Sequence, residues 1–251
     1  MSAAKFFMPA DEFALGTRQK IRTAAVGREK SKVLILDGFY KNPMRVRELF
    51  LDSPAPVWKV TPDSRNFKDY YDCRHAFSMF FGYDQVTSCI GGAVKQEFGF
   101  DLQFPPMAVS NIFQLIKPQP KGHSAYPHND LTRDGKNRQP VNALIYLNTE
   151  TECRGGTALY RHKESGRESI PTGKQERARF EKKHFSRPGI LEDGVNYWCD
   201  VDKYWERFHL IEMKFNRLVI FPSQLFHGAW HESNWFKSYP RLNQVFFSQV
   251  V

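Results

Sequence analysis

The chain has 251 residues, enough for one domain with a large hydrophobic core. Hydrophobic residues make up 41% of it and aromatic residues 15%, which excludes disorder of the whole chain. Four cysteines are scattered without a CxxC pair, and they indicate neither a cysteine zinc site nor a disulfide framework. The first residues lack the apolar run of a signal peptide, and no segment approaches the roughly 20 apolar residues that span a bilayer. We therefore expect a cytoplasmic protein with no membrane partner.

The formal net charge is +9, and more than half of the excess lies in one segment. Residues 161–187 contain nine Lys/Arg and four Glu, a net charge of +5. A nucleic-acid surface would interleave aromatic residues with basic ones, and here only Phe180 and Phe185 do so. The segment is expected to be a solvated helix with flanking loops, an anionic-ligand surface being the alternative. Nucleic acid is not the expected partner.

The first half of the chain predicts one strand and one helix clearly. Residues 1–30 show no strong period and are expected to form an irregular N-terminal arm, followed by a single domain over residues 31–251. Lys32–Asp37 is a short apolar run ended by a turn, which is typical of a buried strand. Asn42 and Pro43 then predict the start of a helix, which the prolines after Ser53 end.

The remaining elements are predicted mostly as strands. Residues 73–100 are expected to be helical or mixed, with a break at Gly91 and Gly92. Apolar or alternating runs predict strands over residues 108–116, 141–148, 157–160, 218–222 and 242–250. A basic insert is placed at about residues 161–215, with a short helix from Ala178 to Phe185. No repeat of 20 to 50 residues indicates a solenoid or a propeller.

Three residues are the first candidates for metal ligands. On an extended chain, side chains at positions i and i+2 point to the same side, so His128 and Asp130 can reach one ion. A second histidine from a distant strand, His227, completes one face of an octahedron. Two imidazoles and one carboxylate leave positions open for a bidentate keto acid and oxygen, as Fe(II) requires. An isolated HxD tripeptide is common, so an ordinary surface or core histidine is the alternative.

Six blocks of the sequence resemble 2-oxoglutarate-dependent dioxygenases of the prolyl-hydroxylase-like group, in the order found in that family. They are Val33–Pro43, His128-x-Asp130, Ala143–Asn148, Gly155–Tyr160, Leu218–Ser223 with His227-Gly228, and Arg241. The resemblance extends over residues 33–247. It implies a mainly β fold with flanking helices, a double-stranded β-helix or cupin-like jelly-roll barrel whose mouth binds the metal.

The resemblance also implies the roles of further residues. Fe(II) would be held by His128, Asp130 and His227, and Arg241 would bind the distal carboxylate of 2-oxoglutarate through paired, charge-assisted bonds. Arg241 follows His227 by 14 residues, a longer separation than relatives usually show, which a lengthened hairpin explains. His231 is the alternative distal ligand, but the preceding Phe-Pro-Ser and the following Gly228 favour His227.

Three polar residues are candidates for contacts with the keto acid or with the iron ligands. They are Tyr126, Gln114 and Asn243. An ordinary polar position beside a barrel strand is the alternative for each of them.

The expected reaction consumes O2, converts 2-oxoglutarate to succinate and carbon dioxide, and hydroxylates a substrate. The carboxylate of Asp130 argues against halogenation, because halogenating relatives lose this ligand. The substrate class is an amino acid, a peptidyl residue or a small natural-product-like molecule, and the sequence leaves its identity, the oligomeric state, and desaturation or cyclisation open. We also hypothesise that the basic segment is a lid over the substrate.

Two other functions compete with hydroxylation. Nucleic-acid alkylation repair uses the same fold, and Arg241-Leu242-Asn243 resembles its signature, but Phe247 stands where that group has a second arginine. A non-enzymatic cupin-like binding protein is the third reading, against which the retained ligand set and Arg241 argue.

Overall fold

The structure is a computed structural model of the chain. It describes residues 10–17, 19–52, 58–60, 73–77, 83–104, 111–116, 127–130, 140–184, 201–230, 232, 235–236 and 238–250. In these residues the strands form sheets of eight, three and two strands, and all neighbouring strands are antiparallel.

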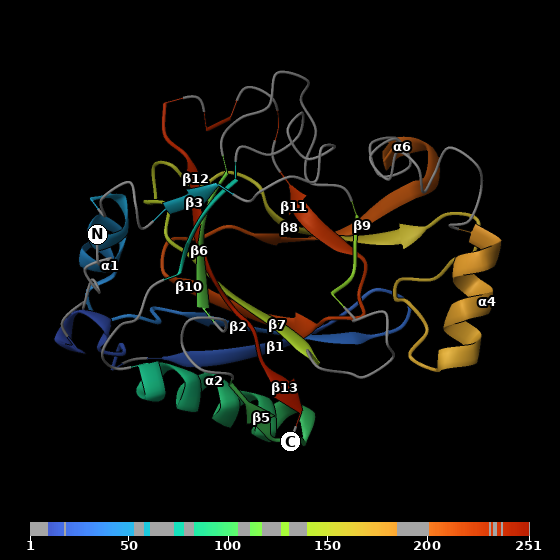
Figure 1. The fold of residues 1–251 in the computed structure, drawn as a ribbon, viewed down its shortest axis with the longest axis horizontal. Coiled ribbons are helices and arrows are strands. Elements are labelled where there is room, and N and C mark those ends of the chain that lie inside the picture. Colours follow the sequence, from blue (N-terminus) through green and yellow to red (C-terminus); the bar gives the residue numbers. More distant parts are fainter. Residues whose placement is uncertain are drawn as a thin grey trace, which may run out of the picture.

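The large sheet has the order β1-β2-β10-β7-β12-β6-β4-β3. Its strands are β1 (Lys20–Val26), β2 (Ser31–Asp37), β10 (Arg217–Pro222), β7 (Val141–Tyr146), β12 (Arg241–Phe246), β6 (Asn111–Ile116), β4 (Cys73–Phe77) and β3 (Trp58–Val60). The four strands β6, β12, β7 and β10 lie side by side although they are far apart in the sequence (Figure 1).

The small sheet has the order β11-β8-β9 and faces the large one. Its strands are β11 (His227–Trp230), β8 (Gly156–His162) and β9 (Trp205–Glu212), while β5 (Leu102–Gln103) and β13 (Gln249–Val250) form the third sheet. From β7 to β12 the chain passes from the large sheet to the small one and back twice. This alternation of two antiparallel sheets is the double-stranded β-helix, or jelly roll, so the expected mainly β fold with flanking helices is confirmed.

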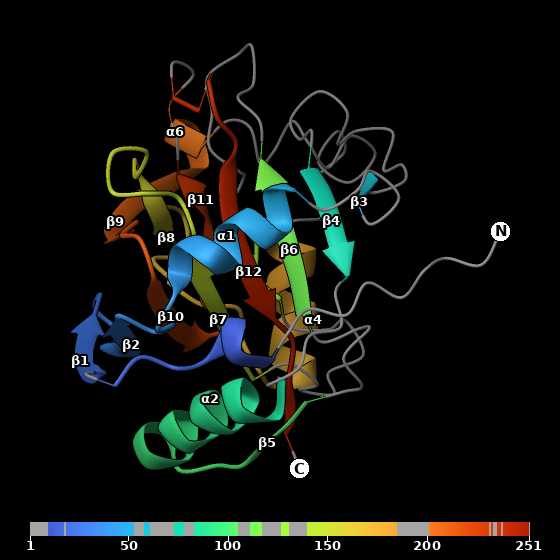
Figure 2. The ribbon, with the colours of Figure 1, turned by 90° about the vertical axis from the view of Figure 1, so that its left-hand side faces the viewer.

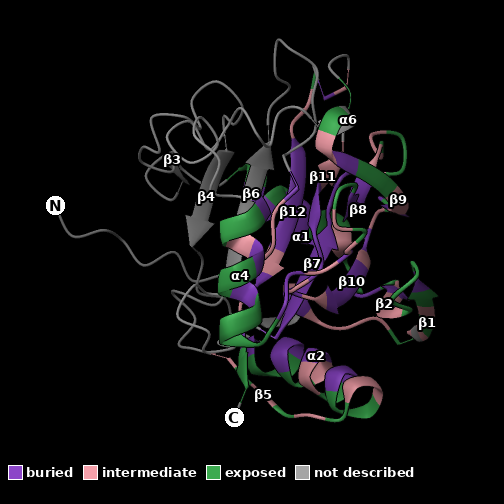
Figure 3. Ribbon diagram, turned by 90° about the vertical axis from the view of Figure 1, so that its right-hand side faces the viewer, coloured by how far each residue is buried: buried purple, intermediate pink, exposed green. Residues whose placement is uncertain are grey.

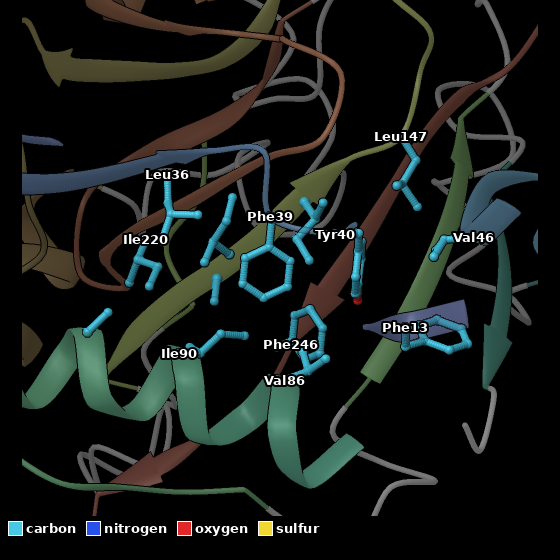
Figure 4. Close-up of a cluster of buried hydrophobic side chains, with 14 of the residues drawn as sticks. Phe13, Leu36, Phe39, Tyr40, Val46, Val86, Ile90, Leu147, Ile220 and Phe246 are labelled. Atoms are coloured by element: carbon cyan, nitrogen blue, oxygen red, sulfur yellow. The ribbon is translucent and has the colours of Figure 1, made fainter. Parts of the chain in front are cut away.

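The described helices lie around the sheets, with α2 (Tyr83–Phe98) along the outer face of the large sheet (Figure 2). They are the 3-10 helix η1 (Ala10–Phe13) and the helices α1 (Pro43–Leu51), α2, α4 (Lys174–His184) and α6 (Val201–Tyr204). Val86 and Ile90 of α2 and Val46 of α1 pack with the outward residues of β2, β7, β10 and β12, among them Ile220 and Phe246 (Figure 4). A second core, with Leu144, Leu159 and Val219, fills the space between the sheets.

Helix α4 covers the outer face of the small sheet. Its buried Phe180 belongs to a third core with Tyr160, Trp205 and Phe226, and the opposite side of the helix is exposed (Figure 3). The short helix expected from Ala178 is therefore confirmed as part of α4, which begins earlier, at Lys174. The insert is shorter than the expected residues 161–215, because residues 205–212 are the core strand β9.

Two other expectations differ from the structure. Residues 20–26 are not irregular but form β1, whose seven residues all pair with β2. Gly91 and Gly92 do not break the helix, because α2 continues through both. The buried stripe that includes Val86, Ile90 and Val94 outweighs the helix-propensity cost of about 1 kcal/mol for each glycine. None of the described helices has the length and the apolar stretch needed to cross a membrane.

Gly155, directly before β8, provides a test of how closely this end of β8 packs against β11. Its φ is +66°, and a Cβ atom there would lie 2.1 Å from the carbonyl oxygen of Trp230 in β11. Gly38 has a similar φ of +72° but open space around the same position, so Gly38→Ala serves as a matched control for backbone strain. We expect Gly38→Ala to lower the free energy of unfolding by about 1 kcal/mol and Gly155→Ala by more than about 3 kcal/mol. Urea denaturation measures both, and equal losses would contradict the close contact of β8 with β11.

Candidate metal centre

A pair of backbone hydrogen bonds positions the HxD segment. The amide of His128 donates to the carbonyl of His227 and the amide of His227 donates to the carbonyl of His128, each over 2.8 Å. The amide of Asp130 donates to the carbonyl of Ser223 over 3.0 Å. The segment therefore extends the small sheet beside β11, and its two ligand-type side chains lie next to His227.

The three side chains converge on one point. The Nε2 atom of His227 lies 3.1 Å from Oδ2 of Asp130, and Nε2 of His128 lies 3.8 Å from Oδ1 of the same carboxylate. One ligand atom from each residue lies within 4.8 Å of the others. Two ligands at right angles on bonds of about 2.1 Å are separated by about 3.0 Å, so these separations fit one ion after small adjustments.

The hydrogen bonds around His227 also suit a metal ion. Its Nδ1 lies 2.9 Å from the carbonyl oxygen of Leu225, which can only accept, so Nδ1–H donates and Nε2 is the ring atom available to a metal ion. Nε2 faces the carboxylate of Asp130, and a metal ion held between the two would contact both. The ring of His227 is buried, whereas the side chains of His128 and Asp130 are 35% and 34% exposed, so the group is open on one side.

The charge of Asp130 is favoured by its surroundings. Burial raises its pKa, but the two histidines and a hydrogen bond from Asn142 outweigh this effect and hold the pKa well below its usual range. The carboxyl group is therefore ionised at neutral pH, as a metal ligand must be. Asn142 is buried on β7, and its Nδ2 atom lies 3.3 Å from Nε2 of His227.

Arg241 lies at the start of β12 and is only 3% exposed. Its Nη1 donates to Oδ1 of Asn243 over 3.0 Å, and its Nη2 lies 3.5 Å from the carbonyl oxygen of Gly156 on the opposite sheet. The guanidinium is 5.6 Å from the ring centre of Tyr146. Arg241 therefore points into the space between the sheets. Asn142 contacts His227 from the same face of the large sheet.

Of the remaining candidate residues, the structure describes Asn243 and the backbone of Gln114. Asn243 contacts Arg241 directly, and the backbone of Gln114 lies opposite Asn243 in the β6–β12 register. Tyr126 and His231 lie outside the described residues.

Four residues near the candidates were missed by the sequence analysis. Tyr146 and Thr157 join the two sheets through a hydroxyl–hydroxyl hydrogen bond of 2.6 Å, and Asn142 contacts His227. His209 lies in one row with Leu159 and His227 across the small sheet, and burial lowers its pKa, so it is neutral at pH 7. The available signal was Asn142, a polar residue within the otherwise apolar run of β7.

Comparisons with known proteins give one family and several similar folds. A model described as "Family of unknown function (DUF6445)" matches residues 17–235. A Pseudomonas putida prolyl-4-hydroxylase is 15% identical, with a TM-score of 0.45 over 88% of this chain and 94% of that one. The epimerase SnoN from nogalamycin biosynthesis is 10% identical, with a TM-score of 0.48 over 88% and 77%. An N-substituted L-amino acid dioxygenase from Burkholderia ambifaria is 11% identical, with a TM-score of 0.41 over 93% and 99%. A comparison with curated proteins found no match.

Alanine variants distinguish His227 from His231, the two candidates for the distal metal ligand. We expect His227→Ala to weaken Fe(II) binding more than about 100-fold, beyond the range typical of outer contacts, because it removes a ligand atom. His231→Ala should leave the affinity unchanged. Anaerobic equilibrium dialysis measures both, and loss of iron in His231→Ala with retention in His227→Ala would reverse the assignment.

Asn142→Leu should weaken Fe(II) binding by roughly 10- to 100-fold, because it removes the amide that donates a hydrogen bond to the carboxylate of Asp130. Asn148→Leu is the matched control, since Asn148 is also buried but its amide bonds the backbone at Pro240 and Leu242. That control should lose stability in urea while keeping its iron affinity. Similar iron affinities in the two variants would show that Asn142 does not orient the ligands.

Proposed function

We propose that this chain, which belongs to the family of unknown function DUF6445, is an Fe(II)- and 2-oxoglutarate-dependent oxygenase. Its substrate class would be an amino acid, a peptidyl residue or a small natural-product-like molecule. The observation that carries the proposal is the convergence of His128, Asp130 and His227, with the buried Arg241 pointing into the same space between the sheets.

The ligand set supports iron in particular. Two imidazoles and one carboxylate on one side of an ion form the facial triad of non-haem Fe(II) oxygenases, which leaves positions for a keto acid and O2. When bound, the iron would couple the oxidative decarboxylation of 2-oxoglutarate to oxidation of a substrate C–H bond. His227 would be held in the ligating tautomer by the carbonyl of Leu225. Asp130 fills the position that a halide would need, which favours hydroxylation over halogenation.

Arg241 would bind the distal carboxylate of 2-oxoglutarate. Its guanidinium offers paired donors to a carboxylate, and burial strengthens such charge-assisted bonds. Asn243 orients this side chain through Nη1. The hydroxyl groups of Tyr146 and Thr157 lie on the same inner side, and burial raises the pKa of Tyr146, so the phenol stays a neutral donor. Leu144, between Asn142 and Tyr146 on β7, would line the space between the iron and the anchored carboxylate.

The basic segment gives little support to a nucleic-acid substrate. Arg161 pairs with Glu168 and Glu206, Arg167 pairs with Glu176, and Arg177 pairs with Glu181. These arginines are engaged within the protein, and the alkylation-repair reading therefore does not follow from the net charge.

The function is tested by succinate formation. The protein is incubated with Fe(II), 2-oxoglutarate and O2 against a panel of amino acids, peptides and methylated oligonucleotides. Succinate that depends on an amino acid or a peptide supports the proposal. Stimulation by the oligonucleotides alone would favour repair, and the absence of succinate from iron-loaded protein, with no turnover of 2-oxoglutarate even without substrate, would contradict an oxygenase.

Arg241→Ala should raise the concentration of 2-oxoglutarate required for half-maximal turnover by roughly 30-fold or more, because truncating one partner of a desolvated charge pair costs about 2–5 kcal/mol. Fe(II) affinity should stay the same. Arg207→Ala is the control, since Arg207 is exposed and stacks 3.8 Å from the ring centre of Trp230. An unchanged requirement for 2-oxoglutarate in Arg241→Ala, measured as succinate formed, would remove Arg241 from the site.

A further inference from the structure

A second group of metal-ligand side chains lies on the outer face of the small sheet. His162 is the last residue of β8, Glu164 follows two residues later, and His184 is the last residue of α4. One ligand atom from each of the three lies within 4.8 Å of the others. Leu159 of β8 faces the core between the sheets, whereas His162 contacts Phe180 and Trp205 on the outer face. The sheet itself therefore separates this group from the iron-type group, which consists of His128, Asp130 and His227.

The two imidazoles are buried in an aromatic shell. His162 is 1% exposed and His184 5% exposed, with ring centres 5.0 Å apart. The rings of Phe180 and Trp205 lie 4.8 Å from His184 and 5.1 Å from His162 respectively. The hydroxyl of Ser165 lies 2.9 Å from Nδ1 of His162, a contact of the kind that orients metal-binding histidines. Glu164 is exposed, so a water molecule could reach the group beside it.

One nitrogen atom in this shell lacks a hydrogen bond within the described part of the chain. Nδ1 of His184 is buried and has no hydrogen-bond partner among the residues that the structure describes. It nevertheless lies 3.5 Å from Oε2 of Glu164, without the alignment of a hydrogen bond. Two ligands on a tetrahedral ion with bonds of about 2.0–2.1 Å are about 3.4 Å apart. A buried nitrogen without a hydrogen-bond partner is energetically costly. An ion between Nδ1 of His184 and Oε2 of Glu164 would provide that nitrogen with a partner.

We propose that His162, Glu164 and His184 bind Zn(II), and that the ion fastens the C-terminal end of α4 to the end of β8. Imidazole ligands favour zinc over magnesium or calcium, and two imidazoles with one carboxylate and one water complete a tetrahedron. The ion would stabilise the fold, because it would connect the end of β8 to the end of α4, the helix that packs on the small sheet.

The test uses the full chain in a His227→Ala background, so that the iron-type group does not contribute and the result does not depend on the proposed function. The protein is stripped with a chelator, and Zn(II) binding is measured by competition with a chromophoric chelator. Co(II) is then substituted, because a tetrahedral site gives intense visible absorption. We expect one tight equivalent of Zn(II), a tetrahedral Co(II) spectrum and a higher melting temperature with zinc.

Two variants define the ligands. Glu164→Gln removes an exposed carboxylate without disturbing the core, and should weaken Zn(II) binding at least tenfold and abolish the zinc-dependent rise in melting temperature. Glu181→Gln, a matched change on α4 in a residue paired with Arg177, should retain both. Equal binding by these two variants, or no tight Zn(II) in the background protein, would overturn the proposal and leave Glu164 and His184 as an ion pair that needs no metal.

Discussion

The candidate site depends on the backbone pairing of His128 with His227, two residues 99 positions apart in the sequence. Residues directly opposite each other in an antiparallel pair project to the same face, so two hydrogen bonds place both imidazoles on one side of the sheet. Asp130 follows at i+2 and points to that side as well. Because neither histidine can slip by one residue without moving to the other face, the register of this short pairing sets the geometry of the whole ligand group.

The small sheet has one group of metal-ligand side chains on each face, because successive side chains along a strand point to opposite faces. On its inner face, His227 meets a half-exposed carboxylate and a space reached by Arg241, an open group suited to exchanging ligands. On its outer face, His162 lies among aromatic rings under α4, in a more buried group whose exposed side is Glu164. Adjacent strands thus present histidines to both faces, and burial rather than ligand type distinguishes what each group can do.

Most strands and the proximity of His128 to Asp130 could be predicted from the sequence, because apolar runs and the i, i+2 spacing of an extended chain are local features. His227, far away in the sequence, was chosen from the resemblance of its surrounding residues to the family pattern. The sequence did not identify Asn142, Tyr146 or Thr157. Their positions in β7 and β8 are buried on both faces, so hydrophobicity does not alternate there and does not tell which side faces the other sheet. The strand β1 was missed for the opposite reason: it is a largely exposed edge strand, and its pairing with β2 leaves no apolar pattern. The Gly91–Gly92 break failed because packing of α2 on the large sheet outweighs local propensity.

The basic segment is attached to the rest of the protein in ways its composition does not indicate. Glu168 is fully buried and accepts hydrogen bonds from the backbone amides of Arg28 and Glu29, at the turn between β1 and β2, and from Arg161. Burial raises its pKa, but these bonds outweigh that effect and lower it, so the carboxylate stays ionised in place. Phe180 adds an apolar contact on the outer face of the small sheet. A lid made of the whole segment would have to break both attachments, at a cost that ligand binding must repay. In the structure residues 161–184 form an outer layer of the jelly roll, and the lid stays a prediction.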